Sequence, residues 1–263
     1  RRRPTLQWRK PTYTTIDVVR WAISAGVYDT KAVTSMQVNG SGGQFGTFVD
    51  VEEFLNVEDT KNTGFFAVRY AFPRKHFVEA EHFRIGRNGN AVIGTSFEFG
   101  GTTFDVGADV STHVSTEVYR LGYGYRFLET ERFVLAGSIG IHVTQFAANI
   151  NAIVSAGSGG FQEVAEFADV TAPLPVFGLS GAWQITDKFA FVGRGQLLRL
   201  ELDGIDGALT HGSFSLEHDT FEKFGFGIGY DFFDIDVSAA NSDWNGNVDI
   251  SFEGPMVFVK ARF

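Results

Sequence analysis

Apolar and polar residues alternate along most of the chain, and this alternation predicts the fold. A period of two residues is typical of a β-strand whose two faces meet different surroundings. The clearest case is residues 223–232, where Phe224, Phe226, Ile228, Tyr230 and Phe232 alternate with Lys223, Gly225, Gly227, Gly229 and Asp231. The same pattern predicts strands at about 65–72, 76–86, 117–127, 133–145, 176–184, 189–202, 234–239 and 256–263.

The segments between these strands fall into two groups of different length. Short turns are predicted near 73–75, 129–131, 186–188 and 232–233. Longer connections are predicted at about 39–62, 87–112, 149–173, 204–218 and 241–247. The four short turns and the five longer connections together join ten strands as five up-and-down pairs. Residues 91–98 and 102–110 also alternate, and a hairpin there would raise the count to twelve.

The bulky face of each predicted strand carries Phe, Tyr, Leu and Val, whereas the small face carries Gly, Ala and Ser with isolated charges. A soluble sandwich would bury its aromatic residues and expose its charges. In a membrane barrel the bulky face meets lipid, and the narrow interior holds small and charged residues. Aromatic residues near strand ends suit the two membrane interfaces, namely Tyr70, Tyr119, Tyr125, Trp183 and Tyr230. We therefore expect an all-β, closed antiparallel transmembrane barrel, with a soluble Phe-rich sandwich as the alternative.

Composition is compatible with this fold and excludes several functions. The chain has 263 residues, 28 Phe, 31 Gly and no Cys, and its mean hydropathy is −0.01. Without cysteine there is neither a disulfide framework nor a thiolate metal site, and we predict no metal and no cofactor. The net charge of −9 argues against nucleic acid as a partner. Residues 1–19 are expected to form a poorly ordered periplasmic segment, and residues 20–263 a single barrel domain.

The final strand carries a more specific signal. Val257, Val259, Ala261 and Phe263 share one face, and the chain ends on the aromatic Phe263. This strand resembles the assembly signal of bacterial outer-membrane barrels. Together with the strand end 121–127 and the turn pattern, it makes the chain similar to the small OmpA-like and OmpW-like porins.

This resemblance implies a location and a set of partners. The location is the outer membrane of a Gram-negative bacterium, and the protein is expected to be a monomer. Its expected partners are the lipid bilayer, lipopolysaccharide and, through the C-terminal strand, the outer-membrane assembly machinery. Such a resemblance indicates architecture and does not identify an activity.

Charged residues on the small faces are predicted to gather in the lumen. The predicted network comprises Arg69, Arg120, Arg126, Arg194, Lys223, Asp231, Asp234, Asp236, Lys260 and Arg262. Glu79 and Glu81 are further candidates, although the face of their strand is ambiguous. Opposite charges should pair there, because an unpaired charge in a low-dielectric interior is costly. The network either fills the lumen or forms a charged constriction that selects small solutes.

The sequence favours a narrow porin or a structural membrane component over an enzyme. A membrane-embedded hydrolase of lipid or peptide is one alternative, and its weak catalytic candidates are His211, His218 and Asp219 in the predicted loop at 204–218. A Gly-x-Ser-x-Gly motif is absent. Binding or adhesion through the long connections is the other alternative. Residues 241–246 resemble the start of a calcium loop, but Phe252 occupies the position of the bidentate Glu, so a plain loop is expected.

Overall fold

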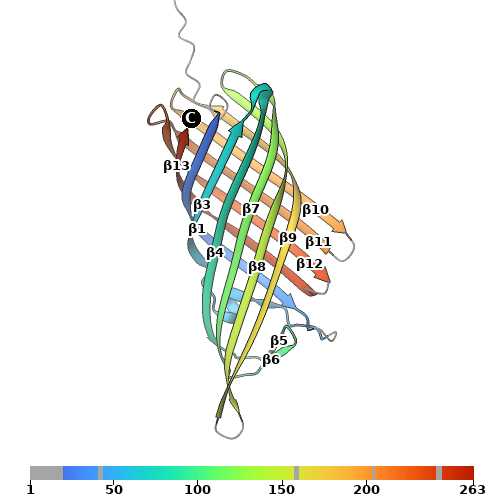
Figure 1. The fold of residues 1–263 in the computed structure, drawn as a ribbon. Coiled ribbons are helices and arrows are strands. Elements are labelled where there is room, and N and C mark those ends of the chain that lie inside the picture. The colour runs from blue at the N-terminus through green and yellow to red at the C-terminus, as the bar shows by residue number, and fades with distance from the viewer. Residues whose placement is uncertain (1–19, 41–43, 157–159, 203–204, 241–244) are drawn as a thin grey trace, which may run out of the picture.

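The computed structural model describes residues 20–40, 44–156, 160–202, 205–240 and 245–263. Within them, ten long antiparallel strands form a ring that closes where β13 pairs with β1 (Figure 1). In ring order, the strands are β1 (Trp21–Val38), β3 (Thr60–Ala71), β4 (His76–Val92), β7 (Asp109–Glu129), β8 (Phe133–Ala156), β9 (Gly160–Gln184), β10 (Phe189–Leu202), β11 (Ile205–His218), β12 (Phe224–Ala240) and β13 (Asn245–Arg262). The predicted closed barrel of ten strands is confirmed. The expected N-terminal segment 1–19 and the calcium-like segment 241–244 lie outside the described residues.

The three short strands and the α-helix lie at one end of the ring. The two-residue strand β2 (Val49–Asp50) pairs with β1 and leads into the helix α1 (Val51–Leu55). β5 (Phe97–Phe99) and β6 (Thr102–Phe104) form the hairpin that the sequence allowed. This hairpin is a separate two-stranded sheet, so it does not raise the ring to twelve strands.

No helix among the described residues is long and apolar enough to cross a membrane.

Short turns lie at one end of the barrel, which is the periplasmic end in outer-membrane barrels. Three of them follow the prediction: the 3-10 turn η1 (Pro73–Lys75), residues 130–132 and residues 185–188. The predicted turn at 232–233 is wrong, because β12 runs without a break through Phe233 and the fourth turn is 219–223. The predicted loop at 204–218 is also wrong, since 205–218 form β11. These two errors cancel in the strand count.

At the other end the chain is longer, but much of the added length is strand. β9 contains 25 residues, whereas about 9–11 residues are enough to cross a bilayer. The barrel therefore continues well beyond the membrane. We call this part the extracellular extension.

The polarity of the two faces inverts where the extension begins. In β12 the outward face changes from Phe232 to Asp234 and Asp236, and the inward face changes from Asp231 to the buried Phe233. In β13 the outward face changes from Val257 to Glu253 and Asp249, and the inward face changes from Lys260 and Arg262 to Phe252 and Ile250. Lipid surrounds the periplasmic half of each strand and water surrounds the extracellular half, so the apolar residues change sides.

This inversion gives the barrel two different interiors. The periplasmic half holds charged and small residues, and we call it the lower lumen. The extracellular half holds an apolar core in which Phe83, Phe146, Leu209, Phe233 and Phe252 are all at least 95% buried. Aromatic residues also enter the lower lumen where a glycine faces them: a Cβ on Gly227 would collide with the ring of Phe258. That glycine makes room for a neighbouring ring inside the barrel.

A cap closes the extracellular end of the apolar core. Val51 and Leu55 of α1, together with Phe97, Phe99 and Phe104 of the hairpin, are almost fully buried against it. The side chain of Asp50 accepts a hydrogen bond from Glu53 N at 3.0 Å and so caps the start of α1. The buried Arg87 of β4 pairs with Glu52 of α1, and its Nη2 donates to Thr34 Oγ1 of β1 at 2.6 Å, so it joins the helix to the barrel wall.

Candidate functional site

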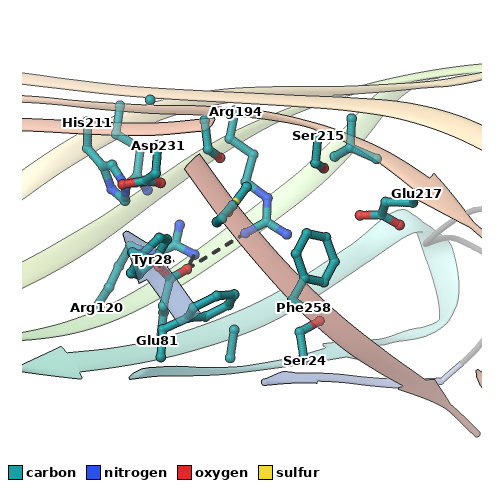
Figure 2. A pocket seen from close by; sticks show the side chains of 17 residues that line it. Ser24, Tyr28, Glu81, Arg120, Arg194, His211, Ser215, Glu217, Asp231 and Phe258 are labelled. Atoms are coloured by element: carbon teal, nitrogen blue, oxygen red, sulfur yellow. Dashed lines mark hydrogen bonds and ion pairs between the residues drawn. The ribbon is translucent and has the colours of Figure 1, made fainter. Parts of the chain in front are cut away.

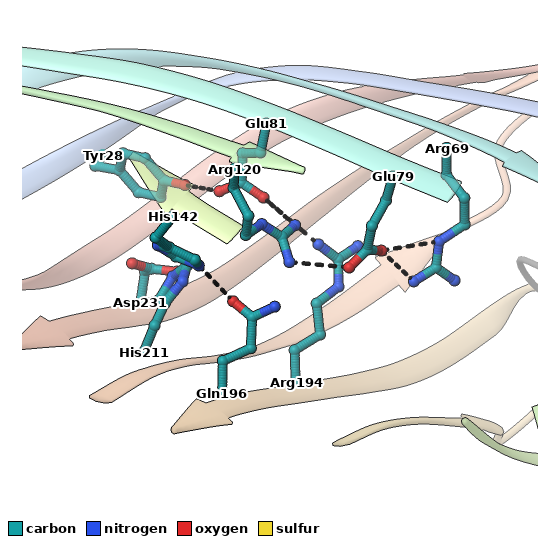
Figure 3. A network of polar contacts seen from close by, with 10 residues as sticks. All are labelled: Tyr28, Arg69, Glu79, Glu81, Arg120, His142, Arg194, Gln196, His211 and Asp231. Carbon is teal, nitrogen blue, oxygen red and sulfur yellow. Dashed lines mark hydrogen bonds and ion pairs between the residues drawn. The ribbon is translucent and has the colours of Figure 1, made fainter. Parts of the chain in front are cut away.

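The candidate site is the charge network of the lower lumen, and Arg120 of β7 lies at its centre (Figure 3). Its Nη1 donates to Glu79 Oε1 at 2.9 Å, and its Nη2 donates to Glu81 Oε2 at 2.6 Å. Glu79 also accepts from Arg69 Nη2 at 2.7 Å, and these two residues are direct cross-strand partners of β3 and β4. Glu79 and Glu81 occupy alternate positions of β4 and so share one face, and their contacts with the buried Arg120 show that this face points inward. The ambiguous face of that strand is thus resolved.

Glu81 is also approached from two further strands. Tyr28 of β1 donates to its Oε1 at 3.4 Å, and Arg194 Nη1 of β10 lies 3.7 Å from its Oε2. β9, β8 and β7 separate β10 from β4 in the ring. The contact between Arg194 and Glu81 therefore crosses the lumen rather than following the barrel wall.

A pair of histidines lies between this network and the apolar core. His142 of β8 is fully buried, and its Nε2 lies 2.7 Å from Gln196 Oε1. His211 of β11 lies with its Nε2 3.2 Å from Asp231 Oδ2. The two imidazole rings are 5.6 Å apart, and the ring of Phe233 stacks on His142 at 6.1 Å.

Further ion pairs line the periplasmic side of the network. Lys260 Nζ donates to Glu217 Oε2 at 2.5 Å, and Arg262 pairs with Asp219. Both cations belong to β13, whereas Glu217 lies at the end of β11 and Asp219 in the turn after it. These pairs therefore fasten the closing strand to the end of β11 and to the turn at 219–223.

The lower lumen contains a small cavity beside Arg194 (Figure 2). It holds about 50 Å³ and is lined by Arg194, Ser215, Glu217, Asp231 and Phe258, among others. Arg194 reaches into it from β10, and its side chain is 31% exposed. A site for one water needs roughly 10–15 Å³ on this measure, so the cavity has room for a few waters and not for a solute.

The structure places most of the predicted lumen charges inside the barrel. Arg69, Arg120, Arg126, Arg194, Asp231, Lys260 and Arg262 all face the lower lumen. Three placements were wrong. Asp234 and Asp236 face outward on the extracellular extension, because water surrounds β12 there. Lys223 is exposed in the turn 219–223.

The catalytic candidates are not brought together. His211 faces the lumen, whereas His218 lies seven positions along the same strand on the opposite face, next to the rings of Phe189 and Phe226. Seven residues of strand span about 23 Å. Asp219 pairs with Arg262 at the periplasmic end. The predicted loop that joined these three residues is the strand β11 and its turn, so this cluster does not exist.

Sequence reasoning missed several acidic and basic partners. Glu217 pairs with Lys260, and Glu52 pairs with Arg87. Counting alternate positions back from Glu217 to His211 places both residues on one face, but the sequence pattern predicts a loop at 204–218. Nothing in the sequence pattern indicates that Arg87 would reach α1, since that contact joins residues of the cap to the barrel wall.

Comparisons with known proteins identify the architecture. Residues 111–243, just over half of the chain, match the family model described as "Protein of unknown function, DUF481". The structure of the outer membrane protease OmpT from Escherichia coli superposes with a TM-score of 0.62 at 10% identity and covers 92% of this chain and 96% of OmpT. Searching curated proteins by sequence gave no match.

Other similar structures have lower scores. The translocator domain of the autotransporter NalP from Neisseria meningitidis has a TM-score of 0.48 at 10% identity, over 92% of this chain and 88% of that domain. The attachment invasion locus protein Ail of Yersinia pestis has 0.35 at 11% identity, over 92% and 97%. At these identities the likeness to OmpT shows the fold alone. The fold is that of a bacterial outer-membrane β-barrel, in agreement with the predicted location.

Proposed function

The chain belongs to the DUF481 family of proteins of unknown function, and we propose that it is a structural component of the outer membrane whose barrel does not conduct solutes. The narrow-porin prediction is the competing function. The observation that carries the proposal is the double closure of the interior. An ion-paired layer fills the lower lumen, and an apolar core fills the extension above it.

The ion-paired layer argues against a pore because its charged side chains are already paired with one another. A selective constriction presents charged groups that a passing ion or solute can contact. Here Arg120 is only 5% exposed and engages two carboxylates, while Glu81 draws side chains from three other strands. A solute would have to break contacts that cross the lumen before it could pass.

The apolar core opposes a pore for a second reason. Water and ions do not enter a packed apolar interior without a free-energy penalty. Phe233, Phe252 and Phe146 lie on the path between the lower lumen and the extracellular end, and α1 and the β5–β6 hairpin cover them. Opening the path would therefore require the cap and the core to come apart together.

We further propose that the protein is a monomer surrounded by lipid and lipopolysaccharide and that β13 directs its assembly. The ring closes within one chain, and its outward belt is apolar. Three exposed basic residues, Lys31, Arg84 and Arg199, lie just above this belt and suit the phosphate groups of lipopolysaccharide.

Single-channel recording in planar bilayers tests the proposal. The purified protein is inserted, and its folding is checked by the difference in gel migration between boiled and unboiled samples. We expect no discrete openings at any voltage at which an established porin, inserted in the same way, conducts. Reproducible unitary openings in the wild-type protein would overturn the proposal and favour the narrow porin.

A matched pair of variants controls for leakage caused by misfolding. Arg194→Ser removes the side chain that crosses the lumen, whereas Arg199→Ser changes an outward residue of the same strand. Both should remain closed, because the apolar core alone blocks the path. Discrete openings in Arg194→Ser and not in Arg199→Ser would mean that the ion pairs are the only gate, which contradicts the double closure.

A further inference from the structure

The two sides of β9 are paired unequally. On one side β9 pairs with β8 along its whole length, from Gly160–Ala156 to Trp183–Phe133. On the other side its pairing with β10 runs only from Gln184–Ala190 to Phe177–Leu197. Figure 1 shows β8 and β9 continuing past the point at which β10 leans away. Above Phe177, no strand among the described residues pairs with this second side of β9, which we call the free edge.

On the opposite side of the extension, β4 also extends beyond its partner strand β3, but there its edge is covered. Pairing of β4 with β3 ends at Phe83–Phe65. Beyond it, Val57 forms a bridge with Gly89, and Glu58 N donates to Asn88 O at 3.0 Å. Asn56 Nδ2 also donates to Asn90 O at 3.0 Å. The edge of β4 is thereby protected, whereas no described residue provides the same cover for β9.

Two prolines define where the free edge can accept a strand. Pro173 and Pro175 keep their places in the ladder with Val143 and Ile141 of β8. Proline cannot donate to a ladder, so their nitrogen atoms face the β10 side. They protect the edge next to the membrane. From Glu163 to Thr171 the residues at the same alternate positions direct their N–H groups to the same side, and no described strand pairs with them there.

The gap beside the free edge does not lead into the barrel. Leu174 is 2% exposed, and its Cδ2 would lie 3.0 Å from a Cβ on Gly207 of β11. This packing across the gap seals the apolar core. The unpaired backbone is therefore available from the outside only.

The side chains beside the free edge select the chemistry of a partner. Glu163 and Asp169 face outward and are exposed, and between them Phe167 is 58% exposed. Across the gap β10 adds the exposed Glu201. Arg199 is the one basic residue among the described residues 162–176 and 198–201. We propose that the free edge of β9 binds an extended, basic segment of a partner protein by strand addition, in which the main chain supplies affinity and alternate side chains supply specificity.

The register of the edge predicts the sequence of that segment. Side chains on one face of an added strand recur every second residue. An arginine or lysine should lie opposite Glu163, an apolar residue four positions away opposite Phe167, and a second basic residue two positions further opposite Asp169. A segment with this spacing gains two charge pairs and one apolar contact on the same face.

Fluorescence anisotropy with a synthetic probe tests the inference on the detergent-solubilised protein. The probe is a labelled nine-residue peptide that alternates threonine with arginine or valine in the predicted order. Its control is the same peptide N-methylated at every second residue, which keeps the charge and loses one edge of donors. We expect the unmodified probe to bind and the methylated probe to bind at least about tenfold more weakly, because several hydrogen bonds are lost.

Variants of the edge separate strand addition from simple charge attraction. Ala165→Pro/Thr171→Pro removes two free-edge donors but retains the β8 ladder, because both positions share the alternation of Pro173 and Pro175. It should weaken binding about tenfold. Glu163→Gln/Asp169→Asn retains the donors and should weaken binding and reduce its dependence on salt. Altered gel migration of unboiled samples would reveal a variant that fails to fold, and Thr171→Val is the matched control.

Four outcomes would overturn the inference. The probe does not bind the wild-type protein, the methylated probe binds as well as the unmodified one, or the folded double-proline variant binds within twofold of the wild type. The fourth is a wild-type dimer in sedimentation equilibrium that the double-proline variant does not form, since the occupant would then be a second copy of this chain. Conductance of the barrel does not affect any of these results, so this inference and the proposed function fail separately.

Discussion

Replacing Arg120 by methionine is the sharpest test of the lumen network. The side chain of Arg120 is 4% exposed and is hydrogen-bonded to Glu79 at 2.9 Å and to Glu81 at 2.6 Å. Methionine has a similar length and no charge. The Arg120→Met variant therefore leaves two buried carboxylates with one cation fewer between them.

The expected loss in the free energy of unfolding depends on the cations that remain beside each carboxylate. Breaking a buried ion pair by removing one partner costs about 3–5 kcal/mol. Glu79 keeps Arg69 at 2.7 Å, and Glu81 keeps Arg194 at 3.7 Å. These neighbours limit the penalty, so we expect the free energy of unfolding to fall by about 3 kcal/mol, at the lower end of that range.

Removing a carboxylate together with the arginine should restore most of this loss. In Arg120→Met/Glu81→Gln the pair of Glu79 with Arg69 stays intact, and Arg194 is exposed enough to the cavity to remain solvated. Replacing a buried pair by neutral groups is often close to neutral. The double variant is therefore expected within about 1 kcal/mol of the wild type.

Urea unfolding in detergent micelles, followed by tryptophan fluorescence and gel migration, measures both quantities. A lower midpoint with an unchanged slope would report a change in stability alone. Arg199→Met, on the outward face of β10, is the control and should stay within about 0.5 kcal/mol. The reasoning is refuted if Arg120→Met loses less than about 1 kcal/mol, or if the double variant is as unstable as the single one.

Three further changes test other parts of the structure. Asp236 and Asp249 face each other across β12 and β13, and partial burial and the surrounding aspartates raise the pKa of both above the ordinary 3.8. Because the raised pKa disfavours the ionised folded state, Asp249→Asn should stabilise the protein at pH 7 by about 0.2–1 kcal/mol, and urea titrations should show this gain vanishing as the pH falls towards 3.8. A Cβ on Gly89 would lie 2.6 Å from Leu55 O, so Gly89→Leu should cost about 1–3 kcal/mol and speed proteolysis within 50–58, unlike the unhindered control Gly86→Ala. Phe263 is 55% exposed, so Phe263→Ala should change the stability of the refolded barrel by less than about 1 kcal/mol while lowering its amount in the outer membrane of cells; equal losses in both assays would contradict an assembly role.

Strand alternation predicted the charged positions of the lower lumen well, because a small or charged inward residue there lies between two outward residues that meet lipid. Arg120, between Tyr119 and Leu121, and Lys260, between Val259 and Ala261, are assigned to the lumen by counting alone. Alternation does not predict which of these charged residues contact one another. The contact of Arg194 with Glu81 depends on ring order and strand tilt, which a single strand's pattern does not contain.

The error at Phe233 has a physical cause. Apolar residues occupy even positions of β12 up to Phe232 and odd positions from Phe233 onward. When the apolar residues change from one face of a strand to the other, the pattern resembles a turn if the whole strand is expected to lie in one environment. In this barrel the strand leaves lipid for water, so the apolar side changes while the backbone continues. β11 was missed for a related reason: its outward residues Ala208, Thr210 and Gly212 face water or a neighbouring ring and give no bulky period.

The same inversion accounts for the position of the two lumen histidines. A barrel with a charged interior in one half and an apolar interior in the other must contain a boundary between them. An imidazole suits this boundary, because its edge bonds polar groups while its face packs on an aromatic ring. His142 meets Gln196 on one side and Phe233 on the other, and His211 meets Asp231 and the same Phe233. Phe233, the first inward apolar residue of β12, is thus the point at which the interior changes from charged to apolar.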